Sequence, residues 1–199
     1  MDLTGDIPGQ LLVGPGQEHR ADRHWPSLYQ AVTGGRSLGV LNVVSYGYHA
    51  FSPPSYRSLE KIYRDGMTVE AFMAAYGADR RDHEVAMLRK VVDGLSAARG
   101  DFWMITVVNK QDLWWDRRDE VRRHYETGPY ADLIESIRRG VGERSFQHEF
   151  VPVSLTLGNM TTANGEVLAS TVSGYDMPTH LSYLNTFFGK LHGLIEQSS

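Results

Sequence analysis

The sequence contains no cysteine, no strong excess of one charge and no long apolar run. Without cysteine, disulfide bonds, thiolate metal sites and cysteine nucleophiles are excluded, which fits a reducing compartment, and we expect a cytoplasmic protein. The 20 basic and 24 acidic side chains give a net charge of −4, so charge provides no reason to bind nucleic acid or an acidic membrane surface. No segment has the length that crosses a bilayer or the basic and apolar start of a signal peptide, so we expect neither export nor membrane anchoring.

Composition and the spacing of apolar residues predict one soluble α/β domain over residues 1–199. With 41% hydrophobic residues, the chain is long enough to bury one sizeable core. Short, nearly continuous apolar runs predict buried strands, and apolar residues at helical spacing predict the helices between them. Strands are expected over 38–44, 102–108 and 150–153, and helices over 83–99, 116–126 and 130–139. This order predicts a mostly parallel sheet with helices on both faces.

Three further segments are expected around this sheet. Residues 49–82 have the pattern of an insertion that carries two short helices. Asn164-Gly165 between apolar and threonine-rich runs predicts a tight hairpin within residues 158–174. The C-terminal segment places apolar residues on one side of a helix, so we expect an amphipathic helix whose buried side includes Leu181 and Phe188.

The segment with the most chemical content is a buried strand, Phe102–Val108, followed directly by Asn109-Lys110-Gln111-Asp112. In open α/β sheets, ligands bind at the carboxyl ends of the strands, where these polar side chains are expected to lie. The Asp112 carboxylate can accept hydrogen bonds from the ring N1–H and the exocyclic N2–H₂ of guanine, an arrangement that adenine does not offer. Asn109 can donate to the purine N7, and the Lys110 stem can lie over the base. In the structural alternative, Asp112 only caps the next helix and Lys110 is a solvated surface residue.

This strand and motif together resemble the guanine-specificity motif of P-loop GTPases of the Ras-like and translation-factor-like kinds. The segment that ends in Ser154-Leu155-Thr156 is similar in part to the Ser-Ala-Lys loop of this family, with Leu155 and Thr156 in place of the usual Ala and Lys. The resemblance implies that Ser154 steadies the specificity loop and that the backbone N–H of Leu155 meets the guanine carbonyl oxygen. A strand that ends in serine is common, so this segment also fits a purely structural role.

Near the start of the chain, Asp6-Ile7-Pro8-Gly9-Gln10 resembles the Asp-x-x-Gly motif of the same family. The resemblance implies that Asp6 holds Mg²⁺ through water, that the Gly9 N–H senses the γ-phosphate and that Gln10 orients the attacking water. A rival assignment places this motif at Val13-Gly14-Pro15-Gly16-Gln17, which follows a better strand but has no aspartate for the metal. The structural alternative is a Pro-Gly turn without any such role.

The sequence contains no Gly-x-x-x-x-Gly-Lys-Ser/Thr loop, the element that wraps the β-phosphate in backbone N–H groups in P-loop proteins. Gly34-Gly35-Arg36-Ser37-Leu38-Gly39 does not replace it, because this segment lacks the lysine and precedes a strand. We therefore expect a P-loop GTPase-like fold that is incomplete at its N-terminus. A chain start downstream of the true one, a split or truncated domain, and a pseudo-GTPase that kept base recognition each fit.

Three functional hypotheses follow from these residues. The first is a guanine-nucleotide-binding domain that takes GTP or GDP with Mg²⁺ and hydrolyses GTP if a phosphate-binding loop is supplied from elsewhere. The second is a catalytically inactive pseudo-GTPase that acts as a regulatory or interaction module, with a protein partner bound through residues 11–36 and 49–82. The third is an unrelated flavodoxin-like α/β protein in which the four-residue motif arose by chance.

Overall fold

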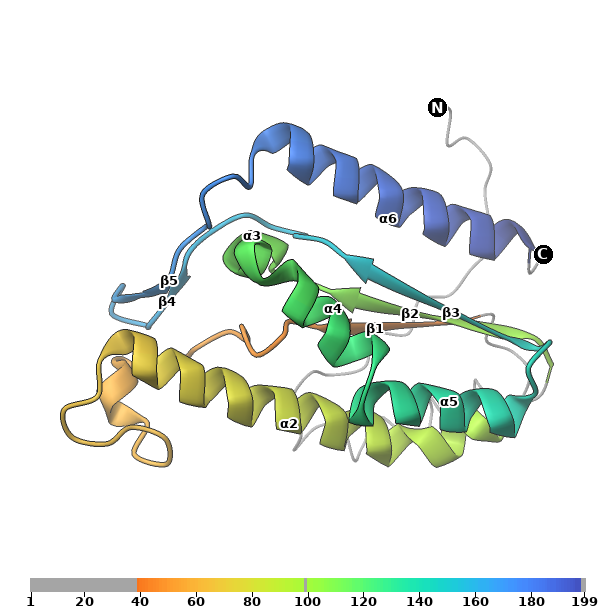
Figure 1. The fold of residues 1–199 in the computed structure, drawn as a ribbon, viewed down its shortest axis with the longest axis horizontal. Coiled ribbons are helices and arrows are strands. Elements are labelled where there is room, and N and C mark those ends of the chain that lie inside the picture. The colour runs from red at the N-terminus through yellow and green to blue at the C-terminus, as the bar shows by residue number, and fades with distance from the viewer. Residues whose placement is uncertain (1–38, 99, 198–199) are drawn as a thin grey trace.

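The computed structural model describes residues 39–98 and 100–197, which form a parallel sheet with helices packed against it (Figure 1). Its strands, which lie side by side in chain order, are β1 (Gly39–Val44), β2 (Phe102–Val108) and β3 (Phe146–Pro152). Val44 pairs with Val108, and Val108 with Pro152, so the three carboxyl ends meet at one edge of the sheet. Three strands in consecutive order occur in several doubly wound sheets, so the sheet order alone identifies no family.

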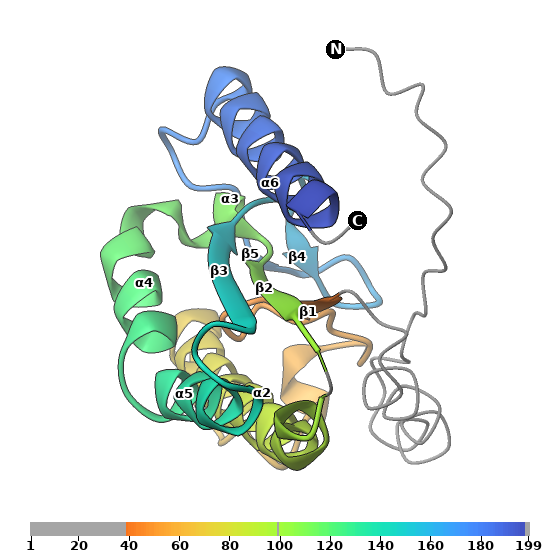
Figure 2. The same ribbon diagram turned by 90° about the vertical axis from the view of Figure 1, so that its right-hand side faces the viewer.

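Helices cover both faces of this sheet (Figure 2). One face carries α2 (Val69–Ser96), α4 (Arg118–Glu126) and α5 (Pro129–Val141), and the other carries α6 (Met177–Gln197). The carboxyl end of β2 leads through α3 (Gln111–Trp114) and the short 3-10 helix η2 (Trp115–Arg117) into α4. Among the residues that the structure describes, no helix has the length and apolar character needed to cross a membrane.

The central strand β2 is buried along its whole length. Its side chains alternate between the two faces of the sheet, as the pleat of a strand requires. Met104 and Val108 join the core under α2 and α5, whereas Ile105 and Val107 join the core under α6. A parallel sheet that is covered on both faces needs apolar residues at nearly every position, which explains the almost unbroken apolar run of this strand.

The predicted separation of a helix over 83–99 from the preceding segment is wrong, because α2 runs without interruption from Val69 to Ser96. Thr68 begins the helix by accepting a hydrogen bond from the backbone N–H of Ala71. The polar residues 79–82 divide the apolar pattern in the sequence, yet they remain helical in the structure. Two of them, Arg80 and Arg81, lie over the rings of Tyr76 and Tyr46 respectively, so their stems and guanidinium groups contribute to packing.

Two predictions at the margins of the sheet are also wrong. β3 begins at Phe146 and not at residue 150, because an edge strand tolerates polar residues such as Gln147 on its partly solvated positions. Leu181 and Phe188 are 51% and 57% exposed instead of buried, although both lie within α6. The apolar residues of α6 extend around more of the helix than its contact with the sheet covers.

A second, smaller core joins the segment after β1 to a hairpin near the C-terminus. The hairpin consists of the antiparallel strands β4 (Met160–Thr161) and β5 (Val167–Ala169). Phe51, Phe72 and Leu168 are buried in this core. In residues 49–68 the structure has one 3-10 helix, η1 (Tyr56–Ser58), in place of the first of the two helices expected there.

The close approach of Gly47 to α2 gives a test of this arrangement. Gly47 has φ of +87°, and a Cβ at this position would lie 2.5 Å from the backbone oxygen of Gly77. We expect Gly47→Ala to lower the free energy of unfolding by about 3 kcal/mol or more, because backbone strain and a backbone clash add together. Gly66 has a similar φ of +82° with nothing within 4 Å, so Gly66→Ala should cost only the strain, about 1 to 2 kcal/mol. Urea denaturation of both variants checks this, and equal losses would contradict the close approach.

Candidate functional site

The carboxyl edge of the sheet brings together the residues that follow β1, β2 and β3. The backbone N–H of Asn109 donates to the carbonyl oxygen of Val44 at 2.8 Å, which ties the end of β2 to the end of β1. The N–H of Val153 donates to the carbonyl of Val108 at 3.0 Å, which ties the end of β3 to β2. The loops after β1 and β3 therefore both begin within hydrogen-bonding distance of the end of β2, at the edge where open α/β sheets bind ligands.

Strained backbone marks two of these loops. Tyr46 (φ 52°) and Lys110 (φ 63°) are the non-glycine residues with positive φ among those that the structure describes. Both lie within two residues of a strand's carboxyl end, and a side chain in this conformation costs about 1 to 2 kcal/mol. Such strain collects at functional sites, where the surrounding structure holds a residue in a required position.

The side chain of Asn109 is held in place by hydrogen bonds to its oxygen. Its Oδ1 accepts from the backbone N–H of Lys110 at 2.8 Å and from that of Leu155 at 2.9 Å. The Trp114 indole N–H donates to the Asn109 carbonyl at 2.9 Å and fixes the backbone as well. Because Oδ1 is engaged, the Nδ2 group is the end of this side chain that can donate to a ligand.

Asp112 lies at the centre of a buried hydrogen-bond network, with no exposed surface. Its Oδ1 accepts from the Ser154 hydroxyl at 2.5 Å, while the Ser154 oxygen accepts from the Asp112 backbone N–H at 2.9 Å. Its Oδ2 accepts from the Thr171 hydroxyl at 3.2 Å and from the Gly158 N–H at 3.4 Å. Its backbone carbonyl accepts from the N–H of Val172 at 2.7 Å. This one residue thus connects the ends of β2 and β3 with the segment that follows β5.

The structure brings together four of the residues singled out in the sequence: Asn109, Asp112, Ser154 and Leu155. Lys110 lies between the first two at the N-cap position of α3 and is half-buried. The capping alternative for Asp112 does not hold, because Asp112 lies inside α3 and its carboxylate bonds to residues after β3 and β5.

Asp6, Gly9 and Gln10, the residues assigned to the metal, the γ-phosphate and the attacking water, lie outside the described residues. The rival assignment at residues 13–17 also lies outside them. Among the residues that the structure does describe, no group of three or more His, Asp or Glu side chains could hold a metal ion. The residues that the sequence assigned to the metal and the phosphates are therefore not part of the described structure.

Thr171 and Gly158 also belong to the Asp112 network, and no pattern in the sequence indicated them. They bond to a carboxylate 59 and 46 residues away in the chain, and neither belongs to a recognisable motif. Their position depends on the hairpin β4–β5, whose end is fixed by the bond from Ala163 N–H to the Pro53 carbonyl at 3.0 Å. Only the tertiary structure brings them to Asp112.

Glu84 was also not predicted, and it anchors the loop after β1. Its buried Oε1 accepts from the backbone N–H of Ser45 at 2.9 Å, and its Oε2 accepts from the Tyr125 hydroxyl at 2.5 Å. Burial raises the pKa of the Glu84 carboxyl, and the hydrogen bonds from Tyr125 and Ser45 oppose that shift. His49 Nε2 lies 3.4 Å from the same carboxylate, and burial lowers the pKa of His49 to about 4. Glu84 thus holds the β1 loop, including the strained Tyr46, beside the loop that carries Asn109.

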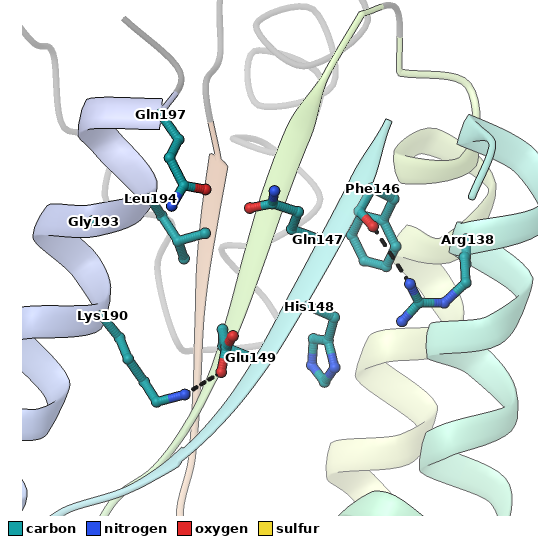
Figure 3. Close-up of a pocket in the computed structure, with 9 residues that line it drawn as sticks. All are labelled: Arg138, Phe146, Gln147, His148, Glu149, Lys190, Gly193, Leu194 and Gln197. Atoms are coloured by element: carbon teal, nitrogen blue, oxygen red, sulfur yellow. Dashed lines mark hydrogen bonds and ion pairs between the residues drawn. The ribbon is translucent and has the colours of Figure 1, made fainter. Parts of the chain in front are cut away.

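Two hollows lie along β3 on the side that does not pair with β2, and neither is lined by Asn109 or Asp112, although the larger one reaches Gln111 and Trp114. The smaller has a volume of about 480 Å³ and is shown in Figure 3, where Lys190 of α6 pairs with Glu149 and Arg138 of α5 donates to the Phe146 carbonyl. The larger, of about 760 Å³, shares Arg138, Glu149 and Lys190 and extends along α4. The larger hollow is lined by four basic and four acidic side chains. The two basic side chains that it shares with the smaller hollow are paired with carboxylates, Lys190 with Glu149 and Arg138 with Glu135. These hollows therefore offer little net positive charge to a phosphate group.

Comparisons of the chain with models of protein families, with curated proteins and with solved structures find no match. The geometry at the carboxyl edge of the sheet is therefore the observation from which a function can be inferred.

Proposed function

We propose that this chain is a guanine-nucleotide-binding domain of the P-loop GTPase class. The observation that carries the proposal is the convergence of Asn109, Asp112, Ser154 and Leu155 at the carboxyl edge of a parallel sheet. Asp112 and Ser154 lie 42 residues apart in the chain, yet they share a 2.5 Å hydrogen bond. A motif that followed β2 by chance would have no reason to bond with the loop after β3 through these atoms. This supports the GTPase reading over an unrelated flavodoxin-like protein.

Base recognition in this proposal uses groups that the hydrogen bonds orient. The Asp112 carboxylate accepts from guanine N1–H and N2–H₂, and the buried Ser154 hydroxyl fixes its rotation through Oδ1. The Asn109 Nδ2 group donates to N7, and the bond from the Lys110 amide to Oδ1 holds the side chain in orientation. The Lys110 stem lies over the base, and the resemblance to the family assigns the Leu155 N–H to the guanine carbonyl oxygen.

Hydrolysis in this proposal needs groups beyond the base site. Asp6 would hold Mg²⁺ through water, Gly9 would register the γ-phosphate and Gln10 would orient the attacking water. Mg²⁺ in nucleotide sites takes one or two carboxylates together with phosphate oxygens and water, so a single aspartate fits the ion's chemistry. A glycine-rich phosphate-binding loop would have to come from outside these 199 residues.

One observation favours the second candidate, a catalytically inactive GTPase-like module that acts through a protein partner. Asp112 has no exposed surface and bonds to three donors of its own chain, as a residue with a purely structural task would. In that case, phosphate release from GTP with Mg²⁺ stays at the uncatalysed rate. A measurable rate that Gln10→Ala abolishes would decide against the inactive module.

The affinity of the purified chain for GDP and ADP tests the proposed function. We expect GDP to bind at least about tenfold more tightly than ADP, because hydrogen bonds to a charged group contribute about 1.5 to 3 kcal/mol each. The absolute affinity should be modest without a phosphate-binding loop, so calorimetric titrations need millimolar nucleotide. Equal affinities for the two nucleotides, or binding of neither, would remove the proposal.

A further inference from the structure

The hydrogen-bond capacity of Asp112 places a condition on base binding. A carboxylate offers about four acceptor positions. Three donors of the chain already use the carboxylate: the Ser154 hydroxyl on Oδ1, and the Gly158 N–H and the Thr171 hydroxyl on Oδ2. Guanine would bring two more donors, N1–H and N2–H₂, so the total would exceed the capacity. At least one of the chain's donors must therefore break its hydrogen bond to the Asp112 carboxylate before guanine can bind there.

The donors on the two oxygens differ in how firmly they are held. Ser154 is completely buried and bonds Oδ1 at 2.5 Å. Gly158 and Thr171 are exposed residues, and their bonds to Oδ2, at 3.4 and 3.2 Å, are at the long and weak end of the hydrogen-bond range. The oxygen that can be released is therefore Oδ2, whereas Oδ1 keeps the carboxylate in orientation.

The Thr171 hydroxyl can move away from Asp112 Oδ2 without disturbing the fold around it. The chain next to it is fixed by the bond from the Val172 N–H to the Asp112 carbonyl at 2.7 Å. The hairpin before it is held by Leu168, which is buried in the second core, and by the bond from Ser55 Oγ to Glu166 at 3.0 Å. A rotation of the Thr171 side chain about its Cα–Cβ bond frees Oδ2 while these backbone contacts remain.

We propose that Thr171 and the Gly158 amide form a displaceable cap on the base-reading carboxylate. The cap satisfies Asp112 Oδ2 when no base is bound, and the N1–H and N2–H₂ groups of guanine replace it. This inference rests on the proposed function, and it identifies Thr171 as a residue that sets guanine affinity by competing with the base. It also explains how a carboxylate with no exposed surface can belong to a ligand site.

The substitution Thr171→Val tests the cap, because valine keeps the branched shape and removes only the hydroxyl. We expect the full-length Thr171→Val chain to bind GDP about tenfold more tightly than the wild type, with ADP affinity unchanged. Thr161→Val, at an exposed threonine on β4 of the same hairpin, is the matched control and should leave both affinities unchanged. A merely structural Thr171 predicts the opposite sign, since its loss would loosen the site and weaken GDP binding. Thermal melting of each variant, followed by circular dichroism, shows whether it is folded.

Amide hydrogen exchange of the wild-type chain gives a second measurement that needs no variant. GDP should speed exchange at Gly158, whose N–H loses its partner, while the Val172 amide stays protected. If the wild type prefers GDP to ADP but Thr171→Val binds GDP equally or more weakly, the cap is wrong and the proposed function stands. If neither the wild type nor Thr171→Val distinguishes GDP from ADP, the proposed function fails, and the cap fails with it.

Discussion

Replacing Asp112 with asparagine is expected to change the base preference of the chain from guanine to xanthine. Asparagine has the shape of aspartate, but it presents an NH₂ group in place of one acceptor oxygen. That group opposes the exocyclic amine of guanine and matches the carbonyl that xanthine carries at the same carbon. We expect GDP binding to weaken by about 10- to 100-fold and xanthosine diphosphate to bind more tightly than GDP, since one charge-assisted bond is lost and two donors face each other.

Two features of Asp112 decide how this experiment is designed. Alanine at this position would leave Ser154 and Thr171 without a partner inside the network, so a loss of binding could reflect loss of folding. The isosteric asparagine keeps one acceptor oxygen for the Ser154 hydroxyl and loses the acceptor for the weaker donors Thr171 and Gly158, so it disturbs the network less than alanine does. A gain of xanthine binding cannot result from unfolding. Asp116→Asn, at an exposed carboxyl just beyond α3, removes the same charge as a control and should leave the preference for GDP intact. If Asp112→Asn weakens the binding of GDP without strengthening the binding of xanthosine diphosphate, Asp112 does not recognise the base.

Removing the Ser154 hydroxyl should cost more stability than a serine substitution normally does. Ser154 donates to Asp112 Oδ1 and accepts from the Asp112 N–H, and both residues are fully buried. Ser154→Ala therefore leaves a buried carboxylate oxygen and a buried N–H without this partner. We expect the free energy of unfolding to fall by about 3 to 4 kcal/mol, since an unsatisfied buried group costs about 1 to 3 kcal/mol and more when it is charged.

Ser136 provides a matched control for this loss. Its hydroxyl also makes one donated and one accepted bond, to the Asp132 carbonyl and from Arg139, but both lie at the exposed surface of α5. Ser136→Ala should therefore change the free energy of unfolding by less than about 1 kcal/mol. Urea denaturation of the two variants gives both values under the same conditions. Similar small losses in both variants would show that the Asp112 network does not hold together the segments after β2, β3 and β5.

The parts of the fold that the sequence predicted well are those where local pattern and tertiary environment agree. Phe102–Val108 is a strand with the predicted bounds, because a buried central strand needs apolar residues at nearly every position. Asn109 and Asp112 were singled out from their chemistry after a buried strand, and Ser154 from the resemblance of its segment to the Ser-Ala-Lys loop. The three lie together because carboxyl ends of parallel strands meet at one edge. At these positions the local sequence pattern was sufficient to predict which residues lie together.

Other features depend on contacts that local sequence does not encode. The helix over Val69–Ser96 continues through a polar stretch because arginine side chains there pack on aromatic rings. The start of β3 was missed because most of its first residues are partly solvated and include polar side chains. The exposure of Phe188 depends on how much of α6 contacts the sheet. Thr171 lies 59 residues after Asp112 in the chain and reaches it only through the position of the hairpin β4–β5.

The described site is closed by its own hydrogen bonds, and this closure connects the fold to the proposed function. Asn109 Oδ1, both Asp112 oxygens and the Leu155 N–H, the groups expected to orient or contact guanine, are engaged within the chain. Such a network keeps the loops after β2 and β3 in place when no ligand is bound. It also predicts that base binding exchanges bonds at the Leu155 amide and at Asp112 Oδ2, while Asn109 Oδ1 keeps its bond from the Lys110 amide.

The most direct test of guanine recognition follows the backbone amide signals of the full-length chain by nuclear magnetic resonance during titration with GDP and, separately, with ADP. We expect GDP to shift the amide signals of Asn109, Leu155 and Gly158 in proportion to occupancy, and ADP at the same concentrations to leave them in place. The signals of Gln147 and Gly193, which line the hollow along β3, should not respond to either nucleotide. Equal shifts with GDP and ADP, or shifts confined to the β3 hollow, would contradict guanine recognition by Asn109 and Asp112.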